Sequence, residues 1–316
     1  MDLKQLRLFV DVAELGSFAK ASEVLDIAQP TLSRQVRALE LELRASLFHR
    51  NGRGVLLTPE GARFVELARG VLHAADAAVQ VLHDGDRRRR GKVVCGLTPS
   101  IAGVMLAELV RRFHKQLPGA QLVIADSWSV TQSDQLRGSR LDFAIAHRPP
   151  ALPRDLVFET LSTEDICLLS ADTIVRDDSI ALSDLAGLPL ALPSRLHTVR
   201  RELERVAAHA GVSLNIVLEG GPMEGLQQLV AEGSAHTIAT RFALLSRRCP
   251  TNIRARRIRS PALTTEFCLA TPPTDGMSPL QREAADIARQ IFSELAASAP
   301  PAWALSKTAN LNVPVT

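Results

Sequence analysis

The first 58 residues restrict the fold more than any other part of the chain, because three short helical patterns and a hairpin signal follow one another almost without a gap. Apolar residues recur at helical spacing from Leu3 to Ala13, and Gly16 ends that segment. Ser17 stands where an N-cap is expected, and the second helix extends to Leu25. So short a stretch can bury these apolar faces only by packing the helices against one another.

A third helix is predicted from Gln29-Pro30, since proline in the first turn leaves no hydrogen bond unmade. Residues 47–58 then favour two short strands around Asn51-Gly52, and Thr58 is expected to cap the next helix. Three helices followed by a hairpin are typical of a winged helix-turn-helix, whose third helix fits the major groove of DNA. The apolar stripe of that third helix is Leu32, Val36, Leu39 and Leu43.

The predicted DNA contacts are the polar residues of the third helix and the arginines of the hairpin. Gln can pair with two atoms of adenine and Arg with two atoms of guanine, whereas Thr and Ser reach bases or phosphates. Arg37 and the hairpin arginines are better placed for phosphate, which gives affinity rather than sequence preference. The candidate DNA-binding residues are Gln29, Pro30, Thr31, Ser33, Arg34, Arg37, Arg50 and Arg53.

The distribution of charge supports a polyanionic partner. The net charge is only +3, but residues 1–92 hold 15 of the 37 Lys and Arg and 12 of the 34 Asp and Glu, so the remainder is balanced. Between Gln29 and Arg53, five arginines stand against two glutamates. A local basic excess of this kind is the electrostatic footprint of a nucleic acid.

The helix predicted from Thr58 to about Leu82 has apolar residues at alternating spacings of three and four. A single helix cannot bury such a seam, which predicts pairing with a second copy; packing on its own domain is the alternative. Residues 84–91 form a polar hinge, where Arg87–Arg90 either contact phosphate or stay solvated, and we favour the solvated linker. The predicted dimerisation residues are Val65, Ala68, Leu72, Ala75, Val79 and Leu82.

From Lys92 onward, strand and helix patterns alternate, which predicts α/β structure with parallel sheets and right-handed crossovers. Two comparable halves suggest two lobes with a cleft between them, and a helix at 278–297 is expected to return to the first lobe. The first half has strands at 93–97, 122–125 and 141–146, with helices from Ser100 and near 132–137. The second has strands at 166–169, 188–192, 214–218 and 236–239, with helices at 198–210 and 223–231.

Spaced motifs in the first 65 residues resemble those of the LysR-type transcriptional regulators. These motifs are Leu6–Val10, Gly16-Ser17-Phe18, Ala19–Leu25, Ala28–Ser33, Leu39-Glu40, Leu47–Arg50 and Leu57–Gly61. The rest of the chain is similar in architecture, and Leu192–His197 is similar to regulators near the nitrogen-assimilation branch. One departure is Arg44, which stands where the family usually has the glycine that closes the recognition helix.

The resemblance implies an all-α winged helix-turn-helix N-terminal domain (1–58), a linker helix with its hinge (59–90), and a two-lobed α/β effector-binding domain like a periplasmic binding protein (91–299). Lobe I would comprise 91–161 and 266–299, lobe II 162–265, and the flexible tail 300–316. It also implies a sequence-specific transcription regulator that forms homodimers or homotetramers, binds interrupted palindromic promoter sites of double-stranded DNA and represses its own gene. RNA polymerase is a further candidate partner.

The second predicted site is the cleft between the lobes, since ligands of open α/β sheets bind beyond the carboxyl ends of strands, at helix N-termini. Hydroxyls and backbone N–H groups, with Arg195 or His197, suit a small-molecule effector that is a carboxylate or another anion. Thr98 and Ser100 can alternatively cap their own helix. The candidate effector-binding residues are Thr98, Ser100, Ser127, Ser129, Ser194, His197, Thr198 and Met223, and the resemblance implies that their loops line the cavity.

Other classes of function find less support. No GxSxG, HExxH or phosphate-binding glycine loop is present, so we expect neither an enzyme nor a cofactor. A solute-binding protein would need an export signal, which the first residues do not resemble, and no apolar run approaches the length of a membrane span. An architectural DNA-binding protein without a ligand is a further rival. Four scattered cysteines form no metal or disulfide pattern and predict reduced, mostly buried thiols in a cytoplasmic protein: Cys95, Cys167, Cys249 and Cys268.

Overall fold

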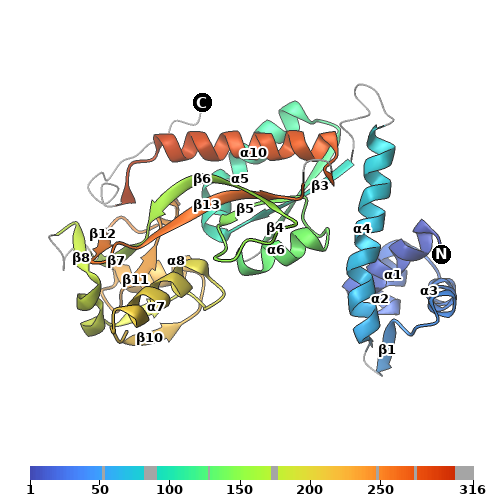
Figure 1. Ribbon diagram of the computed structural model, residues 1–316, viewed down its shortest axis with the longest axis horizontal. Helices are drawn as coiled ribbons and strands as arrows, with labels where there is room; N and C mark the ends of the chain where they lie inside the picture. Colours follow the sequence, from blue (N-terminus) through green and yellow to red (C-terminus); the bar gives the residue numbers. More distant parts are fainter. Residues whose placement is uncertain are drawn as a thin grey trace.

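The computed structural model describes residues 1–51, 54–81, 91–126, 129–171, 177–246, 249–273 and 276–302. A small helical domain packs beside the long helix α4 (Pro59–Val81), and a larger α/β part carries the long helix α10 (Pro279–Ser298) along one side (Figure 1). The two predicted classes of domain are therefore both present.

The N-terminal domain contains the predicted helices and hairpin, each ended by a local signal. Its elements are α1 (Leu3–Leu15), α2 (Phe18–Leu25), α3 (Gln29–Leu43), β1 (Phe48–Asn51) and β2 (Gly54–Leu57). Gly16 ends α1 in the left-handed conformation, with a φ of 63°. The hydroxyl of Ser17 accepts the N–H of Lys20 at 3.4 Å and so caps α2. The antiparallel strands β1 and β2 form the wing, with Asn51 opposite Gly54.

Aromatic rings join the wing to the helices in the core of this domain. The ring centroid of Phe48 lies 5.3 Å from that of Phe9 and 5.8 Å from that of Phe18. The Glu40 carboxylate on α3 accepts the backbone N–H of Leu47 at 2.8 Å and fixes the start of the wing. Close backbone approach requires Gly61, because a Cβ there would lie 2.1 Å from a carbonyl oxygen of residue 47.

Helix α4 begins as predicted, but its packing corrects part of the predicted dimer seam. The hydroxyl of Thr58 accepts the N–H of Gly61 at 2.9 Å, which confirms the expected cap. Val65, Ala68 and Leu72 are 2%, 1% and 8% exposed and belong to the core of their own domain. Their assignment to a partner helix is therefore wrong, because the apolar face of α1 already covers them. Of the other seam residues, Ala75 is half-buried, Val79 is exposed, and Leu82 lies outside the described residues.

A different apolar stripe of α4 lies on the surface. Leu67 and Val71 are 68% and 47% exposed, and Ala74 and Ala78 are exposed as well. Their spacing of four, three and four residues is that of a heptad seam. Leu67 and Val71 each precede an inward-facing residue, Ala68 or Leu72, by one position, which turns them by about 100° around the helix. This outer stripe is thus an apolar surface of α4 that the rest of the chain leaves exposed.

Lobe I is a sheet of order β4-β3-β5-β13-β6 covered by helices. Strands β3 and β4 pair in parallel, as do β3 and β5, so the predicted parallel run is confirmed here. Helix α10 packs in the same apolar core as α5 and β3, as expected for a helix that returns to lobe I. The elements are β3 (Gly91–Leu97), α5 (Pro99–Gln116), β4 (Ala120–Asp126), α6 (Ser129–Arg137), β5 (Phe143–His147), β6 (Val157–Asp165) and β13 (Thr264–Thr271).

Lobe II has a sheet of order β11-β7-β12-β8 beside the parallel pair β10-β9. A bridge between Leu190 and His236 connects β9 to the start of β11. Its elements are β7 (Cys167–Ala171), β8 (Ser179–Ala181), η3 (Leu182–Gly187), β9 (Leu190–Leu192), α7 (Thr198–His209), β10 (Ile216–Glu219), α8 (Met223–Ala231), β11 (Thr237–Ala239), α9 (Arg241–Leu244) and β12 (Ile253–Arg259).

The sheets are mixed rather than purely parallel, which corrects the sequence prediction. Strands β6 and β13 pair with each other in antiparallel fashion and run between the two lobes (Figure 1). In lobe II, β7 is antiparallel to both β11 and β12. The predicted flexible tail also needs correction, because Ala302 is 3% exposed and packs in an apolar cluster of lobe II. Residues 303–316 and the Arg87–Arg90 run lie outside the described residues.

Candidate DNA-binding interface and effector cleft

Helix α3 buries one side and presents a polar side to solvent. Leu32, Val36 and Leu39 are at most 1% exposed and fix the helix on its domain. On the other side, Gln29, Pro30, Thr31, Arg34 and Arg37 are exposed, whereas Ser33 is partly buried. Within the described part of the chain, neither Arg34 nor Arg37 has a carboxylate partner, so both guanidinium groups face solvent.

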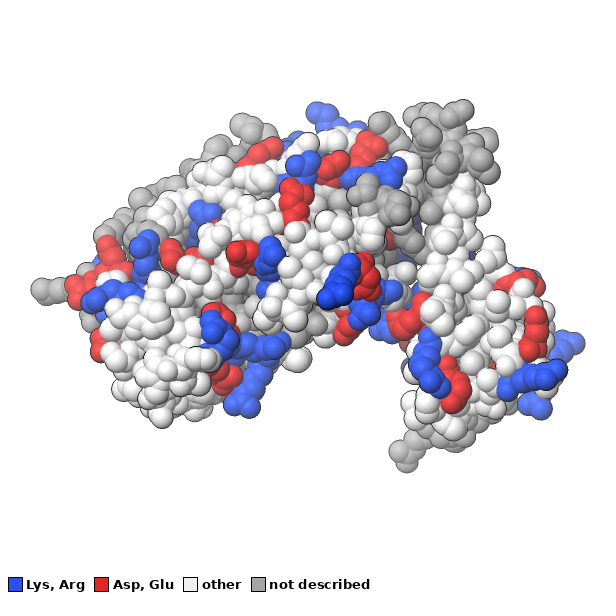
Figure 2. Space-filling model, viewed as in Figure 1, with Lys and Arg blue, Asp and Glu red and all other residues white. Residues whose placement is uncertain are grey.

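The wing arginines cannot be placed in the same way, since Arg53 and the side chain of Arg50 lie outside what the structure describes. Figure 2 shows basic side chains projecting at the outer edge of the N-terminal domain, on the side of α3. Over the α/β part, charges of both signs are interspersed. Exposed basic side chains of the N-terminal domain therefore lie on the same side as the helix that has the unpaired arginines.

Arg44 ends α3 in a conformation that ordinarily belongs to glycine. Its φ and ψ are 52° and 35°, and its N–H reaches back to the carbonyl groups of Glu40 and Leu41. A left-handed conformation costs a side-chain-bearing residue about 1–2 kcal/mol. The Schellman-like end of the helix is thus preserved without the glycine of the family pattern.

We expect Arg44→Gly to raise the free energy of unfolding by about 1 kcal/mol, because the φ strain disappears. Urea unfolding followed by circular dichroism checks this. The matched control is Ala38→Gly at an exposed position inside α3, which should lower stability by about 1 kcal/mol. Equal destabilisation by both substitutions would show that the left-handed residue is not strained.

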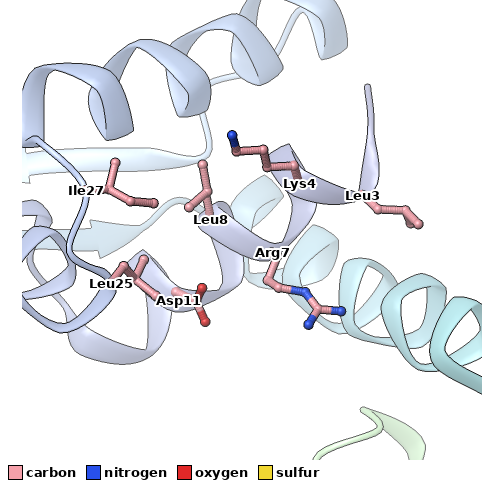
Figure 3. Close-up of a pocket in the computed structure, with 7 residues that line it drawn as sticks. All are labelled: Leu3, Lys4, Arg7, Leu8, Asp11, Leu25 and Ile27. Atoms are coloured by element: carbon pink, nitrogen blue, oxygen red, sulfur yellow. The ribbon is translucent and has the colours of Figure 1, made fainter.

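A surface pocket of ≈ 370 Å³ lies between α1 and the turn that leads into α3 (Figure 3). Its lining is Leu3, Lys4, Arg7, Leu8, Asp11, Leu25 and Ile27. Burial and the neighbouring Glu14 raise the pKa of Asp11, against the lowering effect of Arg7. None of the residues predicted for effector binding contributes to this pocket, so it is separate from the predicted effector site.

Three polar groups gather at the carboxyl edge of lobe I. Strand β3 ends at Leu97, in register with Asp126 of β4 and Ile145 of β5, so the loops after these strands share one edge. Thr98 follows β3 and is 2% exposed; its hydroxyl neither caps α5 nor has another partner among the described residues. The capping alternative for Thr98 is therefore wrong. Ser129 begins α6, and its hydroxyl accepts the N–H of His147 at 3.2 Å.

The matching edge of lobe II carries the second group of predicted residues. Ser194 lies in the loop after β9, and its buried hydroxyl oxygen has no hydrogen-bond partner within the described chain. His197 is the N-cap of α7, Thr198 is its first residue, and Met223 begins α8. Arg195 is 69% exposed and pairs with Glu204, which places it at the rim. Ser100 is partly buried in lobe I, and Ser127 lies outside the described residues.

The two lobes meet at a pair of histidines. The ring centroids of His147 in lobe I and His197 in lobe II are 5.7 Å apart. His147 is 1% exposed, stacks on Phe267 at 4.1 Å, and its Nδ1 lies 3.0 Å from the hydroxyl of Thr265. Burial lowers the pKa of His197 to about 4, and burial together with His197 lowers the pKa of His147 well below its usual range. Both imidazoles are neutral at pH 7.

His147, Thr265 and Arg200 are site residues that sequence reasoning missed. His147 directly follows the predicted strand at 141–146, so the rule that selected Thr98 and Ser127 could have found it. Thr265 lies on a strand that the pattern did not reveal. Arg200 occurs in the first turn of a charged helix, where an arginine is ordinarily solvated, yet it is 0% exposed.

The described residues contain no cluster of three or more His, Cys, Asp and Glu side chains that could hold a metal ion. All four cysteines are free, and burial raises the pKa of Cys167 and of Cys268 to about 12. In the part of the chain that is described, no helix combines the length and the apolar character needed to cross a membrane.

A winged helix-turn-helix on a long helix, followed by two α/β lobes with polar groups at their junction, defines a DNA-binding regulator with a ligand-binding domain. The family model described as "Bacterial regulatory helix-turn-helix protein, lysR family" matches residues 3–62. The model described as "LysR substrate binding domain" matches residues 86–293. The chain belongs to the LysR family of transcription regulators.

Individual relatives agree with this assignment. The nitrogen assimilation regulatory protein nac of Klebsiella aerogenes is 28% identical over 93% of this chain and 96% of its own length. The HTH-type transcriptional regulator IlvR of Caulobacter vibrioides is 32% identical over 76% of this chain and 82% of its own. These proteins regulate transcription and are not enzymes, and this chain is likewise a DNA-binding regulator with an effector-binding domain.

Solved structures share the fold. A full-length OxyR variant from Pseudomonas aeruginosa superimposes with a TM-score of 0.75 at 24% identity, covering 92% of this chain and 94% of that one. Full-length CbnR in complex with its target DNA superimposes with a TM-score of 0.64 at 22% identity, covering 92% of this chain and 100% of that one. The fold class predicted from the sequence is thus confirmed.

Proposed function

We propose that this regulator reads promoter DNA with the exposed side of α3. The observation that carries the proposal is the pair of unpaired arginines on a helix whose opposite side is anchored in the core. Gln29, Thr31, Ser33 and Arg34 are in the turns that reach base edges in helix-turn-helix complexes, and Pro30 starts the helix. Arg37, Arg50 and Arg53 supply phosphate contacts, which set affinity but not sequence.

We expect Arg34→Ala to weaken binding to the specific promoter fragment by roughly 1–3 kcal/mol, about 10- to 150-fold, and to relax the preference at one base pair. Titration of the fragment and its single-base variants at fixed salt measures both effects. The matched control is Arg63→Ala, which removes an exposed arginine from α4 without touching α3. An unchanged footprint and affinity for Arg34→Ala would rule out the groove assignment.

The domain boundaries that we propose are 1–58 for DNA binding, 59–90 for the linker and 91–299 for the effector domain.

Members of this family bind DNA as oligomers, and the outer stripe of α4 suits the first contact between two copies. A tetramer needs a second, different interface. The edge strand β10 offers one, because Ile216, Val217 and Leu218 are 36%, 57% and 42% exposed. Such a tetramer would bind an interrupted palindrome, and RNA polymerase would be a further partner.

The effector site that we propose is the junction of the lobes. Its support is the pair of buried hydroxyl oxygens, on Thr98 and Ser194, that lack partners within the described residues. Ser100, Ser129, His197, Thr198 and Met223 complete the predicted set, together with Ser127, which lies outside the described residues. Thr98→Val should remove an effector contact without loosening α5, since the hydroxyl does not cap that helix. We place the protein in the cytoplasm, where promoter DNA is found.

A further inference from the structure

Arg200 is the largest of the fully buried side chains. Its Nη2 donates to Glu204 Oε1 at 2.7 Å and lies 3.8 Å from Glu219 Oε2. Its Nε and Nη1 have no hydrogen-bond partner among the described residues. A guanidinium stays charged at any physiological pH, so this is a permanent buried cation with unmatched N–H groups.

Unmatched donors on a buried charge are unfavourable and rare in folded proteins. Glu204 balances the charge through one nitrogen only, and Glu219 is beyond hydrogen-bond distance. The structure therefore keeps an arginine whose donors still need oxygen atoms. An oxyanion from outside the chain would supply them, since arginine geometry matches carboxylate and phosphate oxygens.

The location of Arg200 is that of a ligand site. Glu219 is the last residue of β10 and is in register with Leu192, the last residue of β9, so the guanidinium lies at the carboxyl edge of this parallel pair. The next helices, α7 and α8, both begin there without a side-chain cap, which leaves their first N–H groups available to an anion. Side chains in a helix also tilt toward its N-terminus, here toward that edge.

The surrounding loops leave room for an anion. Gly220 and Gly221 have φ values of 98° and 90°, and a Cβ on either would meet nothing within 4 Å. Ser194, in the loop from β9 to α7, adds a buried hydroxyl without a partner in the described chain. Ser194, Arg200 and Gly220–Gly221 together are called the lobe II cup below.

We propose that the lobe II cup binds an oxyanion of the effector, a carboxylate or a group of similar charge, with Arg200 as its permanent counter-charge. This proposal rests on the effector site proposed above and assigns its chemistry. The anion accepts hydrogen bonds from Nε and Nη1, whereas Glu219 lies beside Nη2 and competes for the same positive charge. Arg195 does not have this role because it is exposed and paired with Glu204. His197 does not have it either, because its imidazole is neutral at pH 7.

The test is thermal unfolding of the full-length protein with acetate, succinate and benzoate, each compared with its uncharged amide. We expect at least one carboxylate to raise the melting temperature while its amide does not. Arg200→Lys should weaken that carboxylate by roughly 10- to 100-fold, the usual effect of losing charge-assisted hydrogen bonds. Arg205→Gln, which removes an exposed arginine of α7 that pairs with Glu202, is the matched control and should leave the affinity unchanged.

A second variant keeps the proposal testable if Arg200→Lys fails to fold. The side chain of Glu219 is 47% exposed, so Glu219→Gln should leave the fold and Arg200 in place. Because the substitution removes the competing carboxylate, it should tighten carboxylate binding. The proposal is overturned if no carboxylate stabilises the protein, or if a stabilising one binds Arg200→Lys or Glu219→Gln as it binds the parent chain. If Thr98→Val abolishes such binding and Arg200→Lys does not, the result supports the effector site at the junction of the lobes and contradicts the lobe II cup. Failure of promoter binding would instead count against the proposed function.

Discussion

Glutamate at position 71 is expected to separate the dimer and leave the monomer folded, whereas glutamate at position 72 is expected to unfold the N-terminal domain. Val71 belongs to the outer stripe of α4 and is 47% exposed, so a charge there costs the monomer no more than about 0.5 kcal/mol. In a two-fold dimer the charge occurs twice and must leave water. We expect a dimer weaker by on the order of 100-fold.

Leu72 gives the opposite result because it lies in the core. Its side chain is 8% exposed and belongs to the same apolar cluster as Phe9 and Val65. A carboxylate in that place loses the packing and buries a charge without a partner, which costs about 4 kcal/mol or more. A domain is stable by only about 5–15 kcal/mol, so a large part of its stability would disappear.

Sedimentation velocity and far-ultraviolet circular dichroism distinguish these two outcomes. Val24→Glu is the control, since Val24 is 68% exposed on α2 and the chemical change is the same as at position 71. It should leave both the dimer and the fold intact. A Val71→Glu protein that dimerises as tightly as the parent chain would show that the outer stripe is not the interface. The loss of the dimer should also weaken DNA binding, because paired recognition helices read two half-sites.

The protein is expected to lose stability as the pH falls from 7 to 5, through the two histidines at the lobe junction. Burial holds the pKa of His197 at about 4 and that of His147 well below the usual value. Below about pH 6.5 these two imidazoles therefore bind protons in the unfolded chain but not in the folded chain. Stability from neutral imidazoles is complete above the unfolded pKa and is lost as the pH drops through this window. For His197 alone the loss is about 2 kcal/mol at pH 5.

Thermal unfolding as a function of pH measures this effect. His197→Gln should flatten the dependence, because glutamine does not titrate. His114→Gln, at an exposed position on α5, is the matched control and should behave as the parent chain does. His236 is also buried with a lowered pKa, so a residual slope is expected in the variant. The same slope in His197→Gln and the parent chain would contradict the assigned neutrality of this ring.

The sequence predicts the N-terminal domain well because local signals determine it. The cap at Ser17, the glycine at 16 and the proline at 30 each act on their own backbone, and the apolar spacing fixes which face turns inward. The parallel strands of lobe I were equally accessible, since buried runs such as Phe143–His147 are continuous and apolar. The polar residues after these strands are predicted as site residues because ligands of open α/β sheets bind beyond the carboxyl ends of the strands.

The remaining features depend on contacts between distant segments. Strand β6 mixes exposed and partly buried residues without regular alternation and pairs with β13, about a hundred residues away, so no local pattern reveals it. Helix α4 has two apolar stripes, one residue apart, that both fit a heptad, so the spacing alone does not identify the buried one. Only the packing against α1 shows which one is already covered. Arg200 was missed because burial of an arginine is decided by Glu204, Glu219 and the loops around them.

Helix α6 lies between the junction of the lobes and helix α4, and residues at its two ends contact both. At its first residue, Ser129 accepts a hydrogen bond from the strand that ends at His147. Beyond its last turn, Arg140 forms an ion pair with Glu66 of α4, which Arg69 also binds at 2.8 Å. Gly138 lies so close that a methyl group there would collide with Glu66. Contacts at the two ends of α6 thus connect the neighbourhood of His147 with α4 along a path that does not follow the covalent chain between them.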